Sequence, residues 1–283
     1  MINNLFQDII DEINGKRPVY SDEFLTTGFE PIDNILTGFQ RGKFIVIGGR
    51  PGMGVTTLAL NMFLREAVNQ IPTAYFSLDT TEREIAKKLI SIAGNIPFSN
   101  FKQKTYSRQA QDEIVNCILE LKDIPFFVEC NPQFNIDTLV DRIKVQVSSH
   151  ATKIIYVDNL QLLAYNDANQ DYDRYGEVCI QLKKLASELN IVIVALSGLN
   201  RQVEYREGYE AKIPQISDLY GSSKIEELAD IILMVFRPSY YNIYYDMEGN
   251  EIRNDFYVHI VMHKNGPLGT VKLIINNETF CLT

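Results

Sequence analysis

The sequence predicts an α/β protein with a mostly parallel sheet and helices on both of its faces. Short apolar runs rich in β-branched residues alternate with longer segments in which apolar residues recur at helical spacing. A glycine-rich turn joins one of these runs to the helical segment that follows it. The 283 residues are 46% hydrophobic and show no break in composition, so they can form one large core. Strands that alternate with helices pair in parallel, and parallel sheets are normally covered on both faces.

The N-terminal segment predicts an amphipathic helix that is separate from the main domain. Apolar residues recur at helical spacing from position 2 to position 13, and the turn at 15–18 ends the pattern. A helix with one apolar face needs a partner surface, which is either its own domain or a neighbouring subunit, and the residues favour neither. We therefore expect a linker helix or arm at residues 1–20 and one domain at 21–283.

The main domain is predicted to alternate strands and helices along its length. Strands are expected at 44–47, 73–78, 126–129, 154–158, 191–197 and 231–236. Helices are expected at 58–63, 82–93, 135–148 and 175–189. Thr81 and Glu84 form the pattern of a capping box at the start of the second helix. Residues 256–261 and 270–275 are expected to form a terminal antiparallel pair.

Charge and cysteine content exclude several classes of protein. The net charge of −9 gives no overall attraction to nucleic acid or to an anionic membrane, so contact with DNA would need a local basic patch. Cys117, Cys130, Cys179 and Cys281 are widely spaced, which indicates reduced thiols and excludes a disulfide framework or a zinc site. No apolar run is long enough to span a membrane, and the first residues do not resemble a signal peptide. A cytoplasmic protein is predicted.

A phosphate-binding loop with one substitution follows the first predicted strand. It comprises Gly49, Arg50, Pro51, Gly52, Met53, Gly54, Val55, Thr56 and Thr57. In the pattern G-x-x-x-x-G-K-[S/T], glycines let backbone N–H groups point at phosphates, and the start of the next helix adds its dipole. Thr56 stands where a hydroxyl binds Mg²⁺, whereas Val55 replaces the lysine that reaches the β- and γ-phosphates. ATP or ADP with Mg²⁺ is the predicted ligand.

Loss of this lysine should affect hydrolysis more than binding. A charge-assisted hydrogen bond contributes roughly 1.5–3 kcal/mol, so nucleotide binding weakens but persists while many backbone donors remain. Removal of one preorganised donor from a transition state costs on the order of 10²–10³ in rate. The alternative is a strand-to-helix turn that binds no nucleotide. It is disfavoured because strand, loop and helix follow in the order that the motif requires.

Further segments carry a resemblance to a known family. They are Phe-Ser-Leu-Asp at 76–79, Ile-Ile-Tyr-Val-Asp-Asn-Leu-Gln-Leu at 154–162, Ala-Leu-Ser-Gly-Leu-Asn-Arg at 195–201 and Asn-Gly-Pro-Leu-Gly-Thr at 265–270. With the phosphate loop, the stretch from about 27 to 275 resembles the C-terminal motor domain of DnaB-type replicative helicases. The resemblance implies a RecA-like fold, a hexameric ring, ATP at subunit interfaces and single-stranded DNA in the central channel. It also implies that the arm is a linker helix docking on the next subunit, while the family's N-terminal collar domain has no counterpart here.

The resemblance assigns metal and catalytic roles to specific side chains. Asp158 matches the Walker B carboxylate that holds Mg²⁺ together with the Thr56 hydroxyl, and the alternative is a carboxylate that ends a strand by chance. Asp79 matches the catalytic glutamate that orients and activates the attacking water, but it is one methylene shorter. Lys264 occupies the position of the arginine finger, where it keeps the charge and loses the bidentate fork.

Together the departures from the family pattern predict impaired ATP hydrolysis. Gly198 replaces the glutamine that links the γ-phosphate to the DNA-binding loops, and Met262 replaces the lysine that accompanies the arginine finger. The other altered positions are Val55, Asp79 and Lys264. All five act on the γ-phosphate in the family, so this combined loss is harder to compensate than the loss of one group.

The DNA-binding loops are altered as well. Where the family has an Arg-Glu-Ser-Gly stretch, this chain has Tyr-Gly-Ser-Ser at 220–223, and the preceding loop carries equal numbers of acidic and basic residues. Neutral loops release few counterions, so we expect weak binding to single-stranded DNA. Tyrosines in these loops either stack on bases or, as we favour, pack against the protein. Lys224 is also a candidate to replace the missing loop lysine. The candidate DNA contacts are Arg201, Arg206, Tyr220, Ser222 and Lys224.

Arg237 is the last candidate nucleotide contact. It follows the predicted strand at 231–236, where the family has an arginine near the nucleotide base. The tyrosines at 240, 241, 244 and 245 form either an adenine platform or a hairpin that closes at 248–250, and the residues favour neither.

Three functions fit these observations. The first is an active ATP-driven DNA helicase or translocase on single-stranded DNA. The second is a non-catalytic relative that keeps the fold and the subunit surfaces and acts in a ring of its own or in a mixed ring with an active helicase. The third is a sensor that binds ATP or ADP without hydrolysis. The five altered positions favour a DnaB-type motor domain with impaired hydrolysis, and an active helicase is the alternative.

Overall fold

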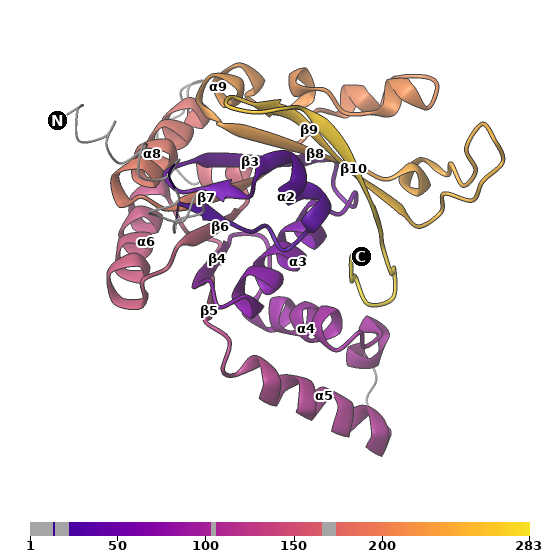
Figure 1. Cartoon of the computed structure of the whole chain (residues 1–283), viewed down its shortest axis with the longest axis horizontal. Coiled ribbons are helices and arrows are strands. Elements are labelled where there is room, and N and C mark those ends of the chain that lie inside the picture. Colours follow the sequence, from indigo (N-terminus) through magenta and orange to yellow (C-terminus); the bar gives the residue numbers. More distant parts are fainter. Residues whose placement is uncertain (1–13, 15–22, 103–105, 166–173) are drawn as a thin grey trace.

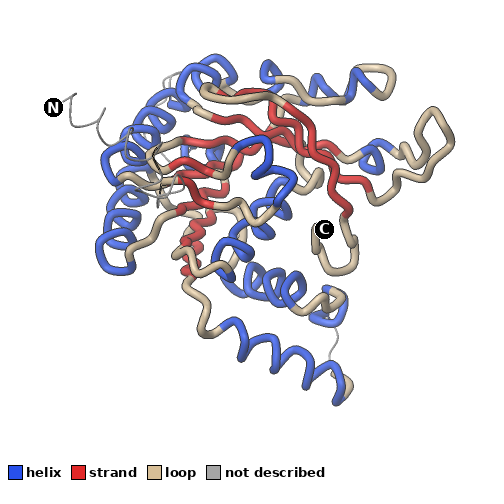
Figure 2. Tube along the Cα trace, in the orientation of Figure 1, coloured by secondary structure: helices blue, strands red, loops and turns tan. Residues whose placement is uncertain are grey.

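The computed structural model describes residues 14, 23–102, 106–165 and 174–283. Apart from Asn14, the predicted N-terminal arm lies outside the described residues. Within them the chain forms a central sheet with helices on both faces (Figure 1, Figure 2). The predicted α/β class is therefore confirmed.

The main sheet contains eight strands from the described part of the chain. In chain order they are β3 (Phe44–Gly49), β4 (Thr73–Ser77), β5 (Phe126–Cys130), β6 (Ile154–Asp158), β7 (Val192–Gly198), β8 (Ile231–Phe236), β9 (Asp255–His263) and β10 (Gly269–Ile274). Their order in the sheet is β10-β9-β8-β3-β7-β6-β4-β5. Strands β3 to β8 pair in parallel, and β9 and β10 extend the sheet antiparallel beyond β8, as predicted. A separate small sheet joins β1 (Phe24–Leu25) to β2 (Phe39–Gln40).

Helices cover both faces of the main sheet (Figure 1). The α-helices of the described residues are α2 (Glu30–Leu36), α3 (Val55–Val68), α4 (Glu82–Ala93), α5 (Arg108–Leu121), α6 (Ile136–His150), α7 (Leu160–Tyr165), α8 (Arg174–Leu189) and α9 (Ser222–Leu228). Short 3₁₀ helices are η1 (Phe98–Lys102), η2 (Arg201–Tyr205), η3 (Glu210–Lys212), η4 (Ile216–Asp218) and η5 (Pro238–Tyr241). Side chains of α2, α3 and α4 pack on one face, and those of α6 to α9 pack on the other.

Alternate residues of the central strands contribute to two separate cores. Ile45 and Ile47 of β3 belong to the core beneath α3, whereas Phe44 and Val46 belong to the core beneath α8. All four side chains are fully buried. Burial on both faces explains why these strands are continuous apolar runs without polar alternation.

Helix α5 was not predicted from the sequence. It lies at the outer edge of the molecule, beyond α4 (Figure 1). Cys117 is the one buried side chain on this helix, while Val115 and Leu119 are 52% and 53% exposed. Apolar residues recur at helical spacing at positions 114, 117, 118 and 121, so the pattern of a helix is present in this segment of the sequence.

The predicted capping box of α4 is only half formed. The Thr81 hydroxyl accepts a hydrogen bond from the Glu84 N–H at 3.3 Å, as expected for an N-cap. The Glu84 carboxylate, however, accepts from the Thr80 hydroxyl at 2.5 Å and makes no return bond to the Thr81 backbone. The neighbouring threonine competes for the glutamate, so the reciprocal part of the prediction is wrong.

The parallel strands place their connecting loops at one edge of the sheet. The segments that follow β3, β4, β6, β7 and β8 all leave from carboxyl ends, and open α/β sheets bind their ligands at this edge. None of the described helices is long and apolar enough to cross a membrane.

Candidate functional site

A cleft of about 700 Å³ opens at the carboxyl edge of the parallel strands. Cavities of this size suit small-molecule ligands. Its lining brings together the phosphate loop, Asp79, Asp158 and Arg237, as predicted. Met53 is the exception among the predicted nucleotide contacts. Its side chain is fully buried, and its sulfur accepts a hydrogen bond from the Arg237 N–H at 3.2 Å.

The phosphate loop has a conformation that favours glycine at two positions. Gly52 and Gly54 have φ angles of 80° and 108°, a region that residues with a Cβ rarely adopt. At Gly54 a Cβ atom would also lie 2.7 Å from the Phe256 ring. Gly54 is the N-cap of α3 and no side chain caps that end. The first N–H groups of the helix are therefore available to an anion.

Val55 is the first residue of α3, and its side chain offers no polar group to a phosphate. Its Cγ2 atom lies so close to Gly49 that a Cβ at that glycine would be 2.4 Å away. The valine also packs against the core beneath α3. An apolar contact inside the loop thus stands where the motif has a cation.

Asp158 and Thr56 form a pair suited to magnesium at the end of β6. The Thr56 hydroxyl donates to Asp158 Oδ2 at 3.1 Å, and the Tyr75 hydroxyl donates to the same oxygen at 2.8 Å. Asp158 is 5% exposed. Burial raises the pKa of its carboxyl, while the bonds from Tyr75 and Thr56 act in the opposite direction.

The donor set of this pair fits Mg²⁺. A hydroxyl and a carboxylate are the hard oxygen ligands that this ion prefers. The described residues contain no cluster of three or more His, Cys, Asp or Glu side chains that could hold a metal by themselves. The ion would therefore take its other ligands from water and from nucleotide phosphates, as is usual for Mg²⁺ in phosphoryl-transfer sites.

Asp79 provides the second carboxylate of the cleft. It follows β4, and its side chain is exposed. Its negative charge is close enough to Asp158 to raise the pKa of that carboxyl further. An exposed carboxylate beside the magnesium pair is placed to orient a water molecule.

The side chain of Gln161 lies against Gly198, a residue that has no side chain of its own. Gln161, on α7, accepts a hydrogen bond from the Gly198 N–H at 3.0 Å and donates to Ser197 Oγ at 2.9 Å. Gln161 also lines the cleft. Gln161 belongs to the segment 154–162, but nothing in the sequence was a reason to assign it a role. Its partner, Gly198, ends β7 and is distant in the sequence.

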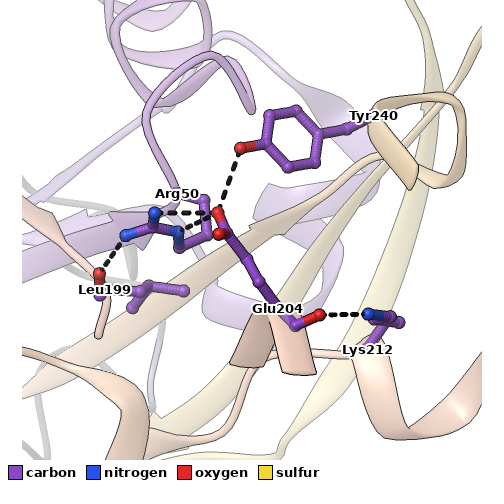
Figure 3. A network of polar contacts seen from close by, with 5 residues as sticks. All are labelled: Arg50, Leu199, Glu204, Lys212 and Tyr240. Carbon is purple, nitrogen blue, oxygen red and sulfur yellow. Dashed lines mark hydrogen bonds and ion pairs between the residues drawn. The ribbon is translucent and has the colours of Figure 1, made fainter. Parts of the chain in front are cut away.

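Arg50 ties the phosphate loop to the segment that follows β7 (Figure 3). Its Nε donates to Glu204 Oε1 at 2.8 Å, its Nη2 lies 2.7 Å from the same oxygen, and its Nη1 donates to the Leu199 carbonyl at 2.6 Å. Tyr240 donates to Glu204 Oε1 at 3.3 Å, and Lys212 donates to the Glu204 carbonyl at 2.6 Å. The hydrogen bond from Arg50 is the main reason that the pKa of Glu204 is lowered. The Arg50 guanidinium is therefore engaged within the chain.

Comparison with known proteins agrees with this geometry. The DnaB-like helicase C-terminal domain family matches residues 25–282, nearly the whole chain. The chain belongs to this family. It is 31% identical over 278 residues to the replicative DNA helicase DnaB of Treponema pallidum (strain Nichols), a match that covers 96% of this chain and 59% of the relative. The chain thus spans less than two thirds of the length of that relative.

Solved structures show the same fold. A solved ATPase domain superimposes with a TM-score of 0.88 at 28% identity, covering 100% of this chain and 98% of the other. A DnaB-like replicative helicase, determined with its interactions with primase, gives a TM-score of 0.86 at 28% identity and is covered over 66% of its chain. The predicted RecA-like fold of this DnaB-like domain is confirmed.

The predicted DNA contacts of the DnaB-like domain separate into two groups. Arg201 and Tyr220 line the nucleotide cleft. Arg206 instead pairs with Asp218, whose side chain is 4% exposed, with Nη1 donating to Oδ2 at 2.9 Å. Ser222 is the first residue of α9. Lys224, on the same helix, does not line the cleft and lies 3.6 Å from a carboxylate oxygen of Glu227.

Lys264 lies outside the nucleotide cleft of its own chain. It follows β9, and its Nζ donates to the Glu227 carbonyl at 2.8 Å beside a smaller cavity of about 200 Å³. Met262 is partly buried and packs against the core beneath α8. The DnaB-like domain therefore does not bring the predicted finger residue to its own phosphate loop, and any action of Lys264 on a nucleotide would be across a subunit interface.

Arg237 and Tyr240 lie beside the phosphate loop. Arg237 Nη2 donates to Asn277 Oδ1 at 2.7 Å, and its buried Nε has no hydrogen-bond partner among the described residues. A Cβ at Gly52 would lie 3.5 Å from the Tyr240 ring. The later tyrosines belong to a turn in which residues 245 and 251 form an antiparallel bridge. Of the two alternatives for the tyrosines, the hairpin closing at 248–250 therefore describes the turn that contains Tyr244 and Tyr245. Tyr240 lies outside this turn, beside the phosphate loop.

Besides Gln161, a cleft lysine was not predicted from the sequence. Lys88, on α4, lines the cleft with Thr56 and Asp158. Its positive charge lowers the pKa of Asp158, although burial dominates that shift. A lysine on a helix is an ordinary surface residue by its sequence pattern, so nothing local indicated its position.

Proposed function

We propose that this DnaB-like domain binds Mg-ATP or Mg-ADP in the cleft and hydrolyses ATP slowly, as a structural or regulatory relative of active replicative helicases. One observation carries the proposal. The phosphate loop keeps its glycines, its free helix N-terminus and the Thr56–Asp158 pair, but Val55 packs on Gly49 where the cation belongs. Backbone donors support binding, and the missing cation weakens transition-state stabilisation.

The cleft residues have separate tasks in the proposed reaction. Hydrolysis breaks the bond between the γ-phosphorus and the oxygen that bridges to the β-phosphate, and it forms a new bond to the water oxygen. Asp79 would orient the water and accept its proton, while Thr56 and Asp158 would hold Mg²⁺. When bound, Mg²⁺ neutralises phosphate charge. The N–H groups at the start of α3 would hold the phosphates.

Other substitutions support slow turnover. The Asp79 carboxylate is one methylene shorter than a glutamate, and Gly198 has no side chain to reach a γ-phosphate. Met262 packs in the core, and the Lys264 ammonium donates to the Glu227 carbonyl of its own chain. In the family each of these positions carries a polar group that acts on the transferred phosphate, and each change shortens, weakens or removes that group.

The proposal includes partners and a cellular location. The family resemblance supports self-association into a hexameric ring or a mixed ring with an active helicase, in which Lys264 would face the neighbouring nucleotide. Weak binding of single-stranded DNA in the cytoplasm is part of the same proposal, because Arg206 and Lys224 are paired within the chain and leave few cations for DNA phosphates.

Steady-state ATP hydrolysis, measured with and without single-stranded DNA, tests the proposal. The wild type should turn over slowly, and Val55→Lys should raise its rate by up to about 10²–10³-fold. Thr56→Ala and Asp158→Ala provide the background rate. A wild type that already hydrolyses ATP rapidly, with no gain from Val55→Lys, would contradict impaired hydrolysis.

The second candidate is an active helicase. The Gln161 amide at Gly198 favours it, because that amide lies where the family's glutamine would act. DNA-stimulated turnover by the wild type that disappears in Gln161→Ala would support this alternative.

A further inference from the structure

The cleft retains several cations although its loop has lost one. Among the described lining residues these are Arg50, Lys88, Arg201 and Arg237. Arg50 is engaged by Glu204 and by a backbone carbonyl, and Arg237 donates to Asn277. These two guanidinium groups are held by the protein in their present positions.

The two remaining cations differ in their surroundings. Arg201 is exposed on η2, and its charge acts on Glu204. Lys88 is half-buried and has no hydrogen bond or ion pair to any described residue. Its charge acts on Asp158 and, one turn back on α4, on the exposed Glu84. The Lys88 ammonium is thus the uncommitted charge on the side of the cleft where the magnesium pair lies.

Helix α4 fixes this lysine relative to the phosphate loop. Ile85 and Leu89 anchor the helix in the same core as Leu58 of α3. Lys88 and Ile92 are one turn apart on α4, and both line the cleft. The helix therefore presents the lysine stem toward the start of α3, while the flexible stem leaves the ammonium free to adjust to a ligand.

We propose that Lys88 supplies the positive charge to the phosphates of a bound nucleoside di- or triphosphate, in place of the loop lysine that Val55 has replaced. This inference rests on the proposed nucleotide binding. An ammonium is a compact point charge with three donors, so it can serve a phosphate from a different helix without reproducing the geometry of the motif. Charge and donor reach the site through the tertiary packing of α4 on α3.

Calorimetric titration of the whole chain with Mg-ADP tests this role without depending on turnover. Lys88→Gln should weaken binding by about 10- to 100-fold, the loss of one charge-assisted contact. Lys88→Arg, which keeps the charge, should stay within a fewfold of the wild type. Lys87→Gln is the matched control, because this lysine is the preceding residue on α4 and does not line the cleft. It should leave binding unchanged.

A rescue experiment separates a charge effect from damage to the helix. In Lys88→Gln, the additional change Val55→Lys should restore most of the lost affinity, because it returns a cation to the usual place. Equal affinity of Lys88→Gln and the wild type would overturn the inference and leave the proposed binding intact. A loss of affinity in Arg201→Gln that is absent in Lys88→Gln would also overturn the inference and leave the proposed binding intact. A wild type that binds no Mg-ADP would overturn both proposals.

Discussion

The two walls of the cleft differ in what their charged groups contact. On the phosphate wall, formed by the loop 49–57 and the end of β6, Asp158 is buried and held by hydroxyls of Thr56 and Tyr75. The opposite wall is formed by the segment 199–228, which contributes Leu199, Arg201 and Tyr220 to the lining. Away from the lining, Arg206 of this segment pairs with Asp218, and Lys224 pairs with Glu227. The first wall offers donors and a carboxylate to a ligand, whereas two cations of the second segment, Arg206 and Lys224, are paired within the segment itself. The described residues therefore support the proposed nucleotide site better than the proposed contacts with nucleic acid.

The largest expected effect comes from the glycine that starts α3. Gly54→Ala places a Cβ at 2.7 Å from the Phe256 ring in a backbone region that favours glycine, so we expect a loss of roughly 3–5 kcal/mol in unfolding free energy. Denaturant unfolding measures it. Gly208→Ala is the control on the opposite wall: its φ is 89°, no atom lies within 4 Å, and about 1 kcal/mol of strain is expected. Equal losses would show that the phosphate wall is not the more constrained one.

A smaller effect is expected where the opposite wall neutralises its own charge. Arg206→Ala leaves the buried Asp218 carboxylate without its cation, which should cost about 2–3 kcal/mol in unfolding free energy. Lys224→Ala, which breaks an exposed pair, should cost less than about 0.5 kcal/mol. If Arg206→Ala leaves stability unchanged but weakens DNA binding, then Arg206 contacts DNA. That result would contradict the conclusion that this cation is engaged within the protein.

The smallest effect concerns the ion pair that joins the two walls. Glu204→Gln removes the negative partner of Arg50, and because the glutamate is partly exposed we expect a loss of only about 0.5–1 kcal/mol near neutral pH. The pKa of Glu204 is lowered in the folded protein, so the wild-type advantage is present above its usual value of 4.5 and disappears as pH falls through the lower folded value.

Unfolding free energies of the wild type and Glu204→Gln, measured at several pH values, test this linkage. Glu207→Gln, an exposed glutamate on the same segment, is the control and should follow the wild type at every pH. If the difference in unfolding free energy between wild type and Glu204→Gln stays the same in acid, the Glu204 charge does not account for the stability that the Arg50–Glu204 pair contributes.

Most strands and the phosphate loop could be predicted because their signals are local. The apolar run of β6 ending in Asp158, and the glycines around Val55, are patterns within a few consecutive residues. Helix α5 was not predicted, although apolar residues recur at helical spacing at positions 114, 117, 118 and 121 and the local signal was therefore present. The capping box of α4 was half wrong because an adjacent hydroxyl competes for the same carboxylate.

By itself, the sequence determined the fold class, the nucleotide loop with its missing cation and the two carboxylates of the cleft. The fold class and the loop follow from backbone geometry and side-chain chemistry over short stretches of chain, whereas Asp79 and Asp158 were assigned through the resemblance of their segments to a known family. Only the tertiary structure decided that Arg50 meets Glu204 across 154 positions, that Gln161 reaches Gly198 and that Lys88 lines the cleft. These contacts depend on β3 lying between β7 and β8 and on α4 packing against α3, arrangements set by the burial of whole faces and written in no local pattern.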